Sequence, residues 1–327
     1  MRMNWCFRRP HLSLAALWTL SGGDWSFAFA SVPVAPVTDK SLRNGRSVPT
    51  LGLQVPEEGP HTTIAWATSF GYRMLDIEGN ESSAGQAIRG SSVSRSRLFL
   101  SARLPENGFQ AAHRGIRQSL QLLRVDYVDL YMMASPKKLV ETWDAMVEMR
   151  KMGLARSLGV CDFELLHMET LKSHGRELPE VLQLKMSPFT WHQHRALLDW
   201  CQRHGVLIQA ARVFALPAQE AFQQLRSLPA LKDHRAKSAA QVLLRWAIQM
   251  GFQVISRSRR KDHIVENADV WSFNLSTEEM QIISALGHGS EQGGGGGREN
   301  PSAHASLDLG DTTLGNRSRE LSPATEL

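Results

Sequence analysis

Residues 127–133 read Tyr-Val-Asp-Leu-Tyr-Met-Met, and residues 139–151 follow them as a longer amphipathic stretch. The first pattern is typical of a buried strand and the second of a helix packed on one side. The same alternation recurs, with further apolar runs at residues 98–100, 181–184, 206–208 and 252–255, and further amphipathic stretches at residues 110–123, 192–204 and 238–250. Repeated strand–helix units predict a parallel sheet.

The number of these units favours a closed barrel. About seven or eight strand–helix units over about 250 residues match the usual length of a (β/α)8 barrel. The alternative, an open doubly wound sheet, would need a Gly-x-Gly-x-x-Gly turn after an early strand. The chain contains no such pattern. We therefore predict an α/β protein of the (β/α)8 TIM-barrel type.

Composition and charge exclude several classes of function. The chain has 327 residues, 42% of them hydrophobic, which is ample for one large core. Its net charge of +5 is spread along the sequence, and no stretch combines basic and aromatic residues, so we expect no nucleic-acid partner. Cys6, Cys161 and Cys201 lie far apart and indicate neither a disulfide framework nor a metal site.

The two ends of the chain differ from its centre, residues 37–287. Residues 1–36 combine three early arginines, an apolar run at residues 12–20 and Ala-Phe-Ala at residues 28–30. This pattern is typical of a secretory or organelle leader, and the alternatives are a disordered leader and a cytoplasmic protein. The apolar run is too short to span a bilayer, so no stable membrane insertion is expected. Residues 288–327 contain five consecutive glycines and predict a disordered tail.

Seven short blocks carry a resemblance to a known family. Residues 71–81 read Gly-Tyr-Arg-Met-Leu-Asp-Ile-Glu-Gly-Asn-Glu, and the other blocks are residues 41–49, 98–104, 126–136, 153–163, 241–246 and 254–258. Taken in chain order, these blocks resemble the signatures of the aldo-keto reductases. The resemblance implies a barrel closed at its bottom by an N-terminal β-hairpin plug, residues 41–49. It also implies an NADP(H)-dependent oxidoreductase acting on a small-molecule carbonyl substrate.

The family's four catalytic residues map unevenly onto this chain. In the family a tyrosine gives a proton to the substrate oxygen, a lysine lowers the tyrosine's pKa, an aspartate pairs with the lysine and a histidine orients the carbonyl. Asp76 matches the aspartate, whereas Arg103 stands at the lysine position and Ala134 at the histidine position. The segment after Asp76 is three residues shorter than the family pattern, and Glu78 stands in place of the tyrosine.

These replacements argue against ordinary reductase chemistry. An arginine keeps its proton and differs in shape from a lysine, so Asp76 and Arg103 are expected to form a structural ion pair. The other tyrosine positions do not replace the missing phenol, because Tyr131 falls on the opposite strand face from Ala134. Glu78 would donate a proton only if an apolar pocket kept it protonated. We expect it instead to be a solvated loop residue.

The residues that the resemblance assigns to cofactor binding match the family pattern better at the adenosine end than at the nicotinamide end. Arg257 and Ser258 fall on the pair that binds the 2′-phosphate, and His263 stands where an arginine is common. Glu266 and Asn267 match residues that contact the adenine. Backbone N–H groups at a helix start together with basic side chains favour a phosphate. The alternative is an exposed basic loop.

The nicotinamide end is more altered. Gln183 matches a glutamine that contacts the carboxamide, but Cys161 and Asp162 replace a Ser-Asn pair there. Arg212 stands where the family has a serine. An error in the gene sequence could remove the tyrosine but would not also change these positions, so divergence is the better explanation.

The sequence therefore predicts an aldo-keto-reductase-like NADP(H)-dependent oxidoreductase domain with weak or no classical carbonyl reductase activity. The alternatives are a non-catalytic dinucleotide-binding regulatory protein and a scaffold barrel that binds no nucleotide. A barrel fold does not separate these, because function resides in the site. No protein partner can be named from the residues.

Overall fold

A computed structural model describes residues 39–214, 234 and 236–287 of the chain. Eight parallel strands form a closed barrel, in which β10 pairs with both β9 and β3. The strands are β3 (Leu51–Val55), β4 (Met74–Ile77), β5 (Phe99–Arg103), β6 (Val128–Met133), β7 (Ala155–Cys161), β8 (Val181–Lys185), β9 (Leu207–Ala211) and β10 (Gln253–Arg257). The predicted (β/α)8 barrel is therefore confirmed.

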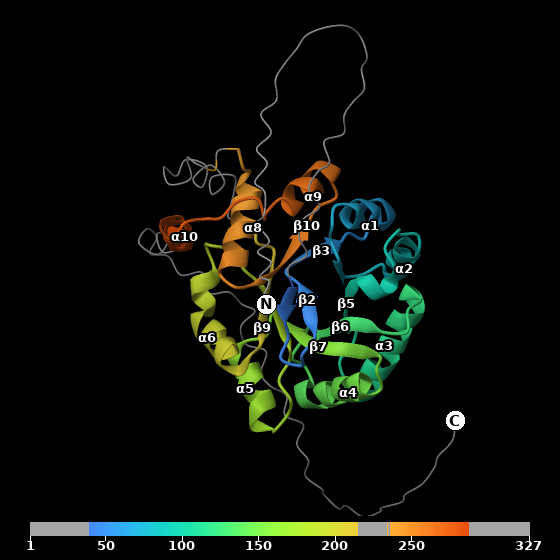
Figure 1. Cartoon of the computed structure of the whole chain (residues 1–327). Coiled ribbons are helices and arrows are strands. Elements are labelled where there is room, and N and C mark those ends of the chain that lie inside the picture. Colours follow the sequence, from blue (N-terminus) through green and yellow to red (C-terminus); the bar gives the residue numbers. More distant parts are fainter. Residues whose placement is uncertain (1–38, 215–233, 235, 288–327) are drawn as a thin grey trace, which may run out of the picture. The chain divides into compact units, whose positions relative to one another are not determined.

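Helices surround this ring of strands (Figure 1). The α-helices are α1 (Pro60–Ser69), α2 (Glu81–Arg89), α3 (Phe109–Leu123), α4 (Leu139–Lys151), α5 (Leu165–Ser173), α6 (Arg195–His204), α8 (Ala239–Gln249), α9 (Lys261–Ala268) and α10 (Thr277–Ser284). Short 3-10 helices are η1 (Arg95–Arg97), η2 (Trp191–His194) and η4 (Ala285–Gly287). Helix starts follow from local sequence: Ser238 forms a capping box with Gln241 at the start of α8.

The hairpin expected at the bottom of the barrel is present. β1 (Asp39–Ser41) and β2 (Ser47–Pro49) pair antiparallel. Gly45 in the connecting turn has φ +80°, a conformation that glycine adopts without strain. Val48 is fully buried and belongs to the same apolar cluster as Met74 and Phe99, which lie at the amino ends of their strands. The hairpin therefore covers the amino-terminal end of the barrel interior.

Alternation along each strand separates the interior from the helix layer. On β4, Leu75 packs in the main core with the helices, whereas Met74 and Asp76 lie on the interior side. The interior is apolar near the amino ends of the strands and polar farther along them. The fold thus places the polar side chains at the carboxyl end, where barrels of this type carry their sites.

Two sequence predictions lie outside the described residues. They are the leader at residues 1–36 and the tail at residues 288–327. Within the described residues, the search for a helix of sufficient length and apolar character to cross a membrane found none.

Candidate functional site

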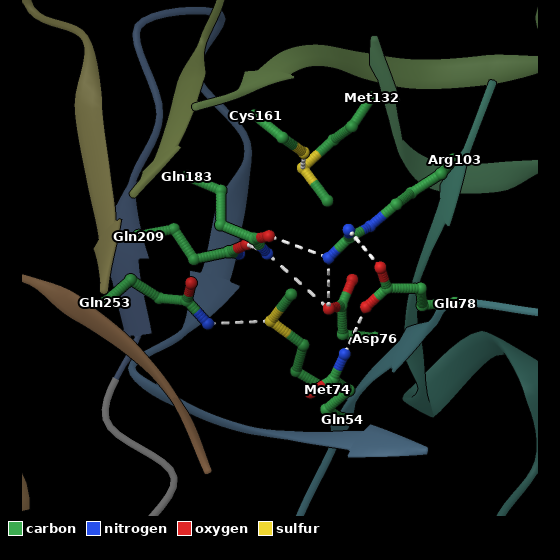
Figure 2. A network of polar contacts seen from close by, with 10 residues as sticks. All are labelled: Gln54, Met74, Asp76, Glu78, Arg103, Met132, Cys161, Gln183, Gln209 and Gln253. Carbon is green, nitrogen blue, oxygen red and sulfur yellow. Dashed lines mark hydrogen bonds and ion pairs between the residues drawn. The ribbon is translucent and has the colours of Figure 1, made fainter. Parts of the chain in front are cut away.

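Six polar side chains inside the barrel form one connected network, which comprises Gln54, Asp76, Glu78, Arg103, Gln183 and Gln209 (Figure 2). Asp76 comes from β4, Arg103 ends β5, and Gln183 lies in the middle of β8. Arg103 reaches across the barrel, with its Nη2 2.7 Å from Oε1 of Gln183 and 3.4 Å from Oδ2 of Asp76. Its Nη1 lies 2.7 Å from Oε1 of Glu78. The guanidinium therefore links the carboxyl end of β4 to the middle of β8 instead of forming a bidentate pair with Asp76.

Burial sets the electrostatics of this network. Asp76 is 1% exposed, and burial raises the pKa of its carboxyl while the nearby Arg103 charge opposes that rise. The Arg103 side chain is 19% exposed. Burial lowers the pKa of Arg103, but its negative neighbours, led by Asp76, outweigh this effect and the pKa is raised. A guanidinium in this setting holds its proton and cannot pass it to a substrate.

Glu78 lies at the rim of the network instead of in a solvated loop. Its side chain is 44% exposed, yet both carboxylate oxygens are engaged. Oε1 accepts a hydrogen bond from Arg103, and Oε2 accepts one from the side chain of Gln54. Neither oxygen therefore presents a hydrogen toward the barrel mouth. Glu78 acts as an anchor for Arg103 in this structure.

A very short connection holds Glu78 in this position. Only Glu78, Gly79 and Asn80 link β4 to α2. Gly79 has φ +83°, and a Cβ at this position would lie 2.9 Å from the Glu57 side chain. Asn80 has φ +38° and its side chain accepts a hydrogen bond from Ser83 N, which caps α2. The three-residue link therefore runs directly from β4 into α2 and leaves Glu78 beside Arg103.

The chain's three tyrosines all lie away from the mouth. Tyr72 is buried, and its hydroxyl donates to the carbonyl oxygen of Ile264. Tyr131 faces the helix layer and is fully buried there. Tyr127 precedes β6 at the amino-terminal end, against the guanidinium of Arg156. No phenol therefore reaches the network around Asp76.

The family's histidine position and the remaining predicted nicotinamide positions lie at or after the carboxyl ends of β6, β7 and β9. Ala134 follows β6 and is exposed, with only a methyl group to offer. Cys161 is buried, its Sγ lies 3.7 Å from Sδ of Met132, and burial raises its pKa to about 12. Asp162 follows it with φ +52° and pairs with Lys185 at 3.4 Å. Arg212 follows β9 with φ +53°.

Three glutamines form a ladder that sequence reasoning found only in part. Gln183, Gln209 and Gln253 lie in register on β8, β9 and β10. Gln183 donates to Gln209, while its own Oε1 accepts from Arg103, so its amide is occupied within the barrel. Gln209 and Gln253 carry no family motif. The sequence feature that could have indicated them is one glutamine within or beside the apolar run of each of β8, β9 and β10, together with Gln54 on β3.

A second basic region lies at the amino end of α9, after β10. Arg259 and Arg260 are each paired with a carboxylate. Arg257 and Lys261 are exposed and have no ion-pair partner among the described residues. Ser258 accepts a hydrogen bond from Arg260 N at 3.1 Å and so shapes the turn into the helix. Free cations beside unpaired helix N–H groups can hold an anionic group such as a phosphate.

The remaining predicted residues lie farther along α9. His263 is exposed and Glu266 is half-buried. Asn267 is 3% exposed, and its Oδ1 has no hydrogen-bond partner within the described part of the chain. A buried amide oxygen without a partner is costly unless a ligand or water satisfies it. The structure thus brings the adenosine-end residues together on one turn and helix, apart from the network around Arg103.

Comparison with known proteins gives a consistent assignment. A sequence model of the Aldo/keto reductase family matches residues 50–288. Methylglyoxal reductase DkgA of Escherichia coli (strain K12) is 32% identical over 262 residues, covering 77% of this chain and 94% of that protein. The 9,11-endoperoxide prostaglandin H2 reductase of Trypanosoma cruzi (strain CL Brener) is 32% identical over 265 residues, covering 78% of this chain and 93% of that protein.

Solved structures agree with this assignment. An aldo/keto reductase from Brucella melitensis superposes with a TM-score of 0.69 at 29% identity, covering 76% of this chain and 99% of that chain. A variant of Gox0644 in complex with NADPH superposes with a TM-score of 0.67 at 28% identity, covering 76% of this chain and 93% of that chain. The match extends over nearly the whole length of both neighbours.

Proposed function

The chain belongs to the aldo/keto reductase family, and from this premise we propose that it is an NADP(H)-binding barrel with weak or no classical carbonyl reductase activity. In carbonyl reduction NADPH supplies a hydride to the carbon. The protein must then place a proton donor within hydrogen-bond reach of the carbonyl oxygen, which is typically worth about a hundred- to ten-thousand-fold in rate.

The observation that carries the proposal is that no tyrosine, the proton donor of the family pattern, lies in the mouth of the barrel. All three tyrosines lie elsewhere, and both oxygens of Glu78 accept hydrogen bonds. Arg103 could only donate a hydrogen bond to a carbonyl oxygen, because its pKa is raised by the surrounding negative groups. A hydrogen bond polarises the carbonyl without completing the proton transfer. Slow reduction is the expected result.

Cofactor binding is supported by the other end of the site. Arg257 and Lys261 offer free positive charge, and Asn267 offers a buried amide oxygen without a partner. These groups suit the 2′-phosphate and the adenine of NADP(H) respectively. The solved neighbour bound to NADPH supports the same cofactor. For any residual activity, small reactive aldehydes are the proposed substrates, because DkgA is named a methylglyoxal reductase.

Titration of the full chain with NADPH, followed by quenching of tryptophan fluorescence, tests the binding half of this proposal. We expect saturable binding with a dissociation constant on the order of 1–100 µM. Binding of NADH should be weaker, because it lacks the 2′-phosphate. No binding up to about 1 mM NADPH would contradict the proposal and leave a scaffold barrel.

A further inference from the structure

A second charged cavity lies at the opposite end of the barrel from Asp76 and Arg103. A cleft of about 590 Å³ opens beside the hairpin, near the amino ends of β4 to β7. Its lining includes four arginines and two aspartates, which are Arg46, Arg73, Arg97, Arg156, Asp39 and Asp129. Positive charge therefore exceeds negative charge in this open cleft.

One of the two aspartates is already neutralised. Asp129 Oδ2 lies 2.8 Å from Arg95 Nη2, and its Oδ1 lies 3.6 Å from Arg156 Nη1. Its Oδ2 also accepts a hydrogen bond from Leu100 N at 2.9 Å. With Asp129 paired in this way, Asp39 is the one carboxylate of the lining that is left to balance the other arginines.

The remaining three arginines lack carboxylate partners among the described residues. Arg46 and Arg97 are exposed at the cleft. Arg73 is partly buried, and its Nη1 donates to the carbonyl oxygens of Thr68 at 2.9 Å and Tyr72 at 2.8 Å. Burial and then the charge of Arg97 lower the pKa of Arg73. Cations held together in this way repel one another, and a bound anion would relieve that repulsion.

From these side chains we propose that the cleft binds a small molecule carrying one or more phosphate groups. Guanidinium groups match phosphate oxygens in geometry and charge, and several of them can bind one phosphate at once. The volume falls in the range of small-molecule pockets, about 300–1,000 Å³. The position is remote from the network around Arg103, so the ligand is a regulator or a stabiliser and not a substrate.

A single-stranded nucleic acid fits the cleft less well. Such ligands need exposed aromatic rings on which bases can stack. The nearby Tyr127 ring is packed against Arg95 at 4.3 Å and Arg156 at 3.5 Å from its centroid. Phe99 in the lining is 8% exposed. The site therefore offers charge without a stacking platform.

Calorimetric titration of the full chain with inorganic pyrophosphate, at about 0.15 M ionic strength, tests this proposal. We expect one saturable site, and a dissociation constant that rises about tenfold in each of Arg97→Gln and Arg46→Gln. Arg117→Gln removes the same charge from an exposed position on α3 and serves as the matched control. Arg257→Gln tests whether pyrophosphate binds instead at the turn before α9. Arg117→Gln should stay within about twofold of the parent, and Arg257→Gln should weaken binding less than Arg97→Gln does.

Three results would overturn the proposal. The first is no saturable binding up to about 10 mM pyrophosphate. The second is a loss of binding in Arg257→Gln or Arg117→Gln that equals the loss in Arg97→Gln, because it would assign the phosphate to α9 or to diffuse charge. The third is sedimentation with vesicles containing phosphatidylinositol 4-phosphate that depends on Arg97, without binding of free pyrophosphate. That result would assign the cleft to a membrane surface. None of these outcomes depends on NADPH binding at the mouth.

Discussion

The barrel mouth and the amino end of α9 both carry arginines, and the two regions use them differently. At the mouth, both terminal nitrogens of Arg103 contact Asp76, Glu78 or Gln183 inside the protein, and only its buried Nε has no hydrogen-bond partner among the described residues. At α9, Arg257 and Lys261 have no ion-pair partner among the described residues. One region is closed on itself, and the other is open to an anionic ligand.

This difference is the basis of the proposed function, in which the barrel binds NADP(H) but reduces carbonyls slowly or not at all. Phosphate binding needs only free cations and helix N–H groups. Hydride transfer coupled to protonation needs a donor at one position, and the short β4–α2 link, which begins with Glu78, carries no tyrosine there. The following predictions test two points: that the polar groups of the mouth are engaged with one another, and that the cations at α9 are available to a ligand.

The largest expected effect concerns Cys161, which lies beneath Arg103. Burial raises its pKa to about 12, so at pH 8 the thiolate fraction is about a thousandfold below that of a free cysteine with a pKa of about 8.5. Iodoacetamide should therefore label Cys161 about a thousandfold more slowly in the folded chain than in urea. Peptide mass spectrometry measures the rate. Rapid labelling of Cys161 beside protected Cys201, which is also buried, would show an open mouth.

Removing the central cation should destabilise the protein. Arg103→Met leaves the buried Asp76 carboxyl uncompensated, and we expect the free energy of unfolding to fall by about 3 kcal/mol in urea denaturation. Arg117→Met, on the exposed face of α3, should change it by less than about 0.5 kcal/mol. Adding Asp76→Asn to Arg103→Met should recover much of the loss.

The pH dependence of Arg103→Met provides a check on the same contact. The pKa of Asp76 is already raised in the folded state, and loss of the arginine raises it further. The folded state then binds a proton more readily than the unfolded state, so stability should rise as pH falls toward that pKa. A variant as stable as its control at every pH would contradict the role given to Arg103.

At the open end, Arg257→Gln should weaken NADPH binding. Loss of one charge-assisted contact is expected to raise the dissociation constant for NADPH about tenfold. The value for NADH should change by less than about twofold, because NADH has no 2′-phosphate. Fluorescence titration of both nucleotides against the variant and Arg117→Gln measures the difference. An equal effect on both nucleotides would assign Arg257 to fold stability instead.

The smallest effect is expected from restoring the family's lysine and histidine at the mouth. The double variant Arg103→Lys/Ala134→His recovers the lysine and histidine of the family pattern. It still lacks the phenol, so its rate of NADPH oxidation with methylglyoxal should stay within about twofold of the parent. Robust turnover by this variant would show that the missing tyrosine is not the limiting feature.

Much of the fold was readable from the sequence because several strands contain short, mainly apolar runs. β6 and β8 were predicted in this way, and the hairpin turn was marked by Asn44 and Gly45. β3 gave a weak signal because Gly52 and Gln54 interrupt its five residues. A Cβ at Gly52 would lie 2.7 Å from Cδ1 of Ile255 and 3.0 Å from the Met74 side chain, so a larger residue there would require these side chains to move.

The site was readable only where it carries a motif. Asp76 and Arg103 were expected to pair, but the division of the guanidinium among Asp76, Glu78 and Gln183 depends on three-dimensional reach across the barrel. Glu78 was expected in solvent, and the short link to α2 instead turns it toward Arg103. Gln209 was missed because one amide within an apolar strand has no distinctive spacing. Register between neighbouring strands, which sequence does not give, makes it part of the network.

The most direct test is the steady-state rate of NADPH oxidation by the full chain, followed at 340 nm with saturating NADPH and methylglyoxal. The closed mouth predicts turnover below about 0.1 per second, a hundredfold under the typical enzyme value of about 10 per second. Turnover near about 10 per second would contradict the account. It would require a proton donor other than a tyrosine, because none of the three tyrosines lies at the mouth.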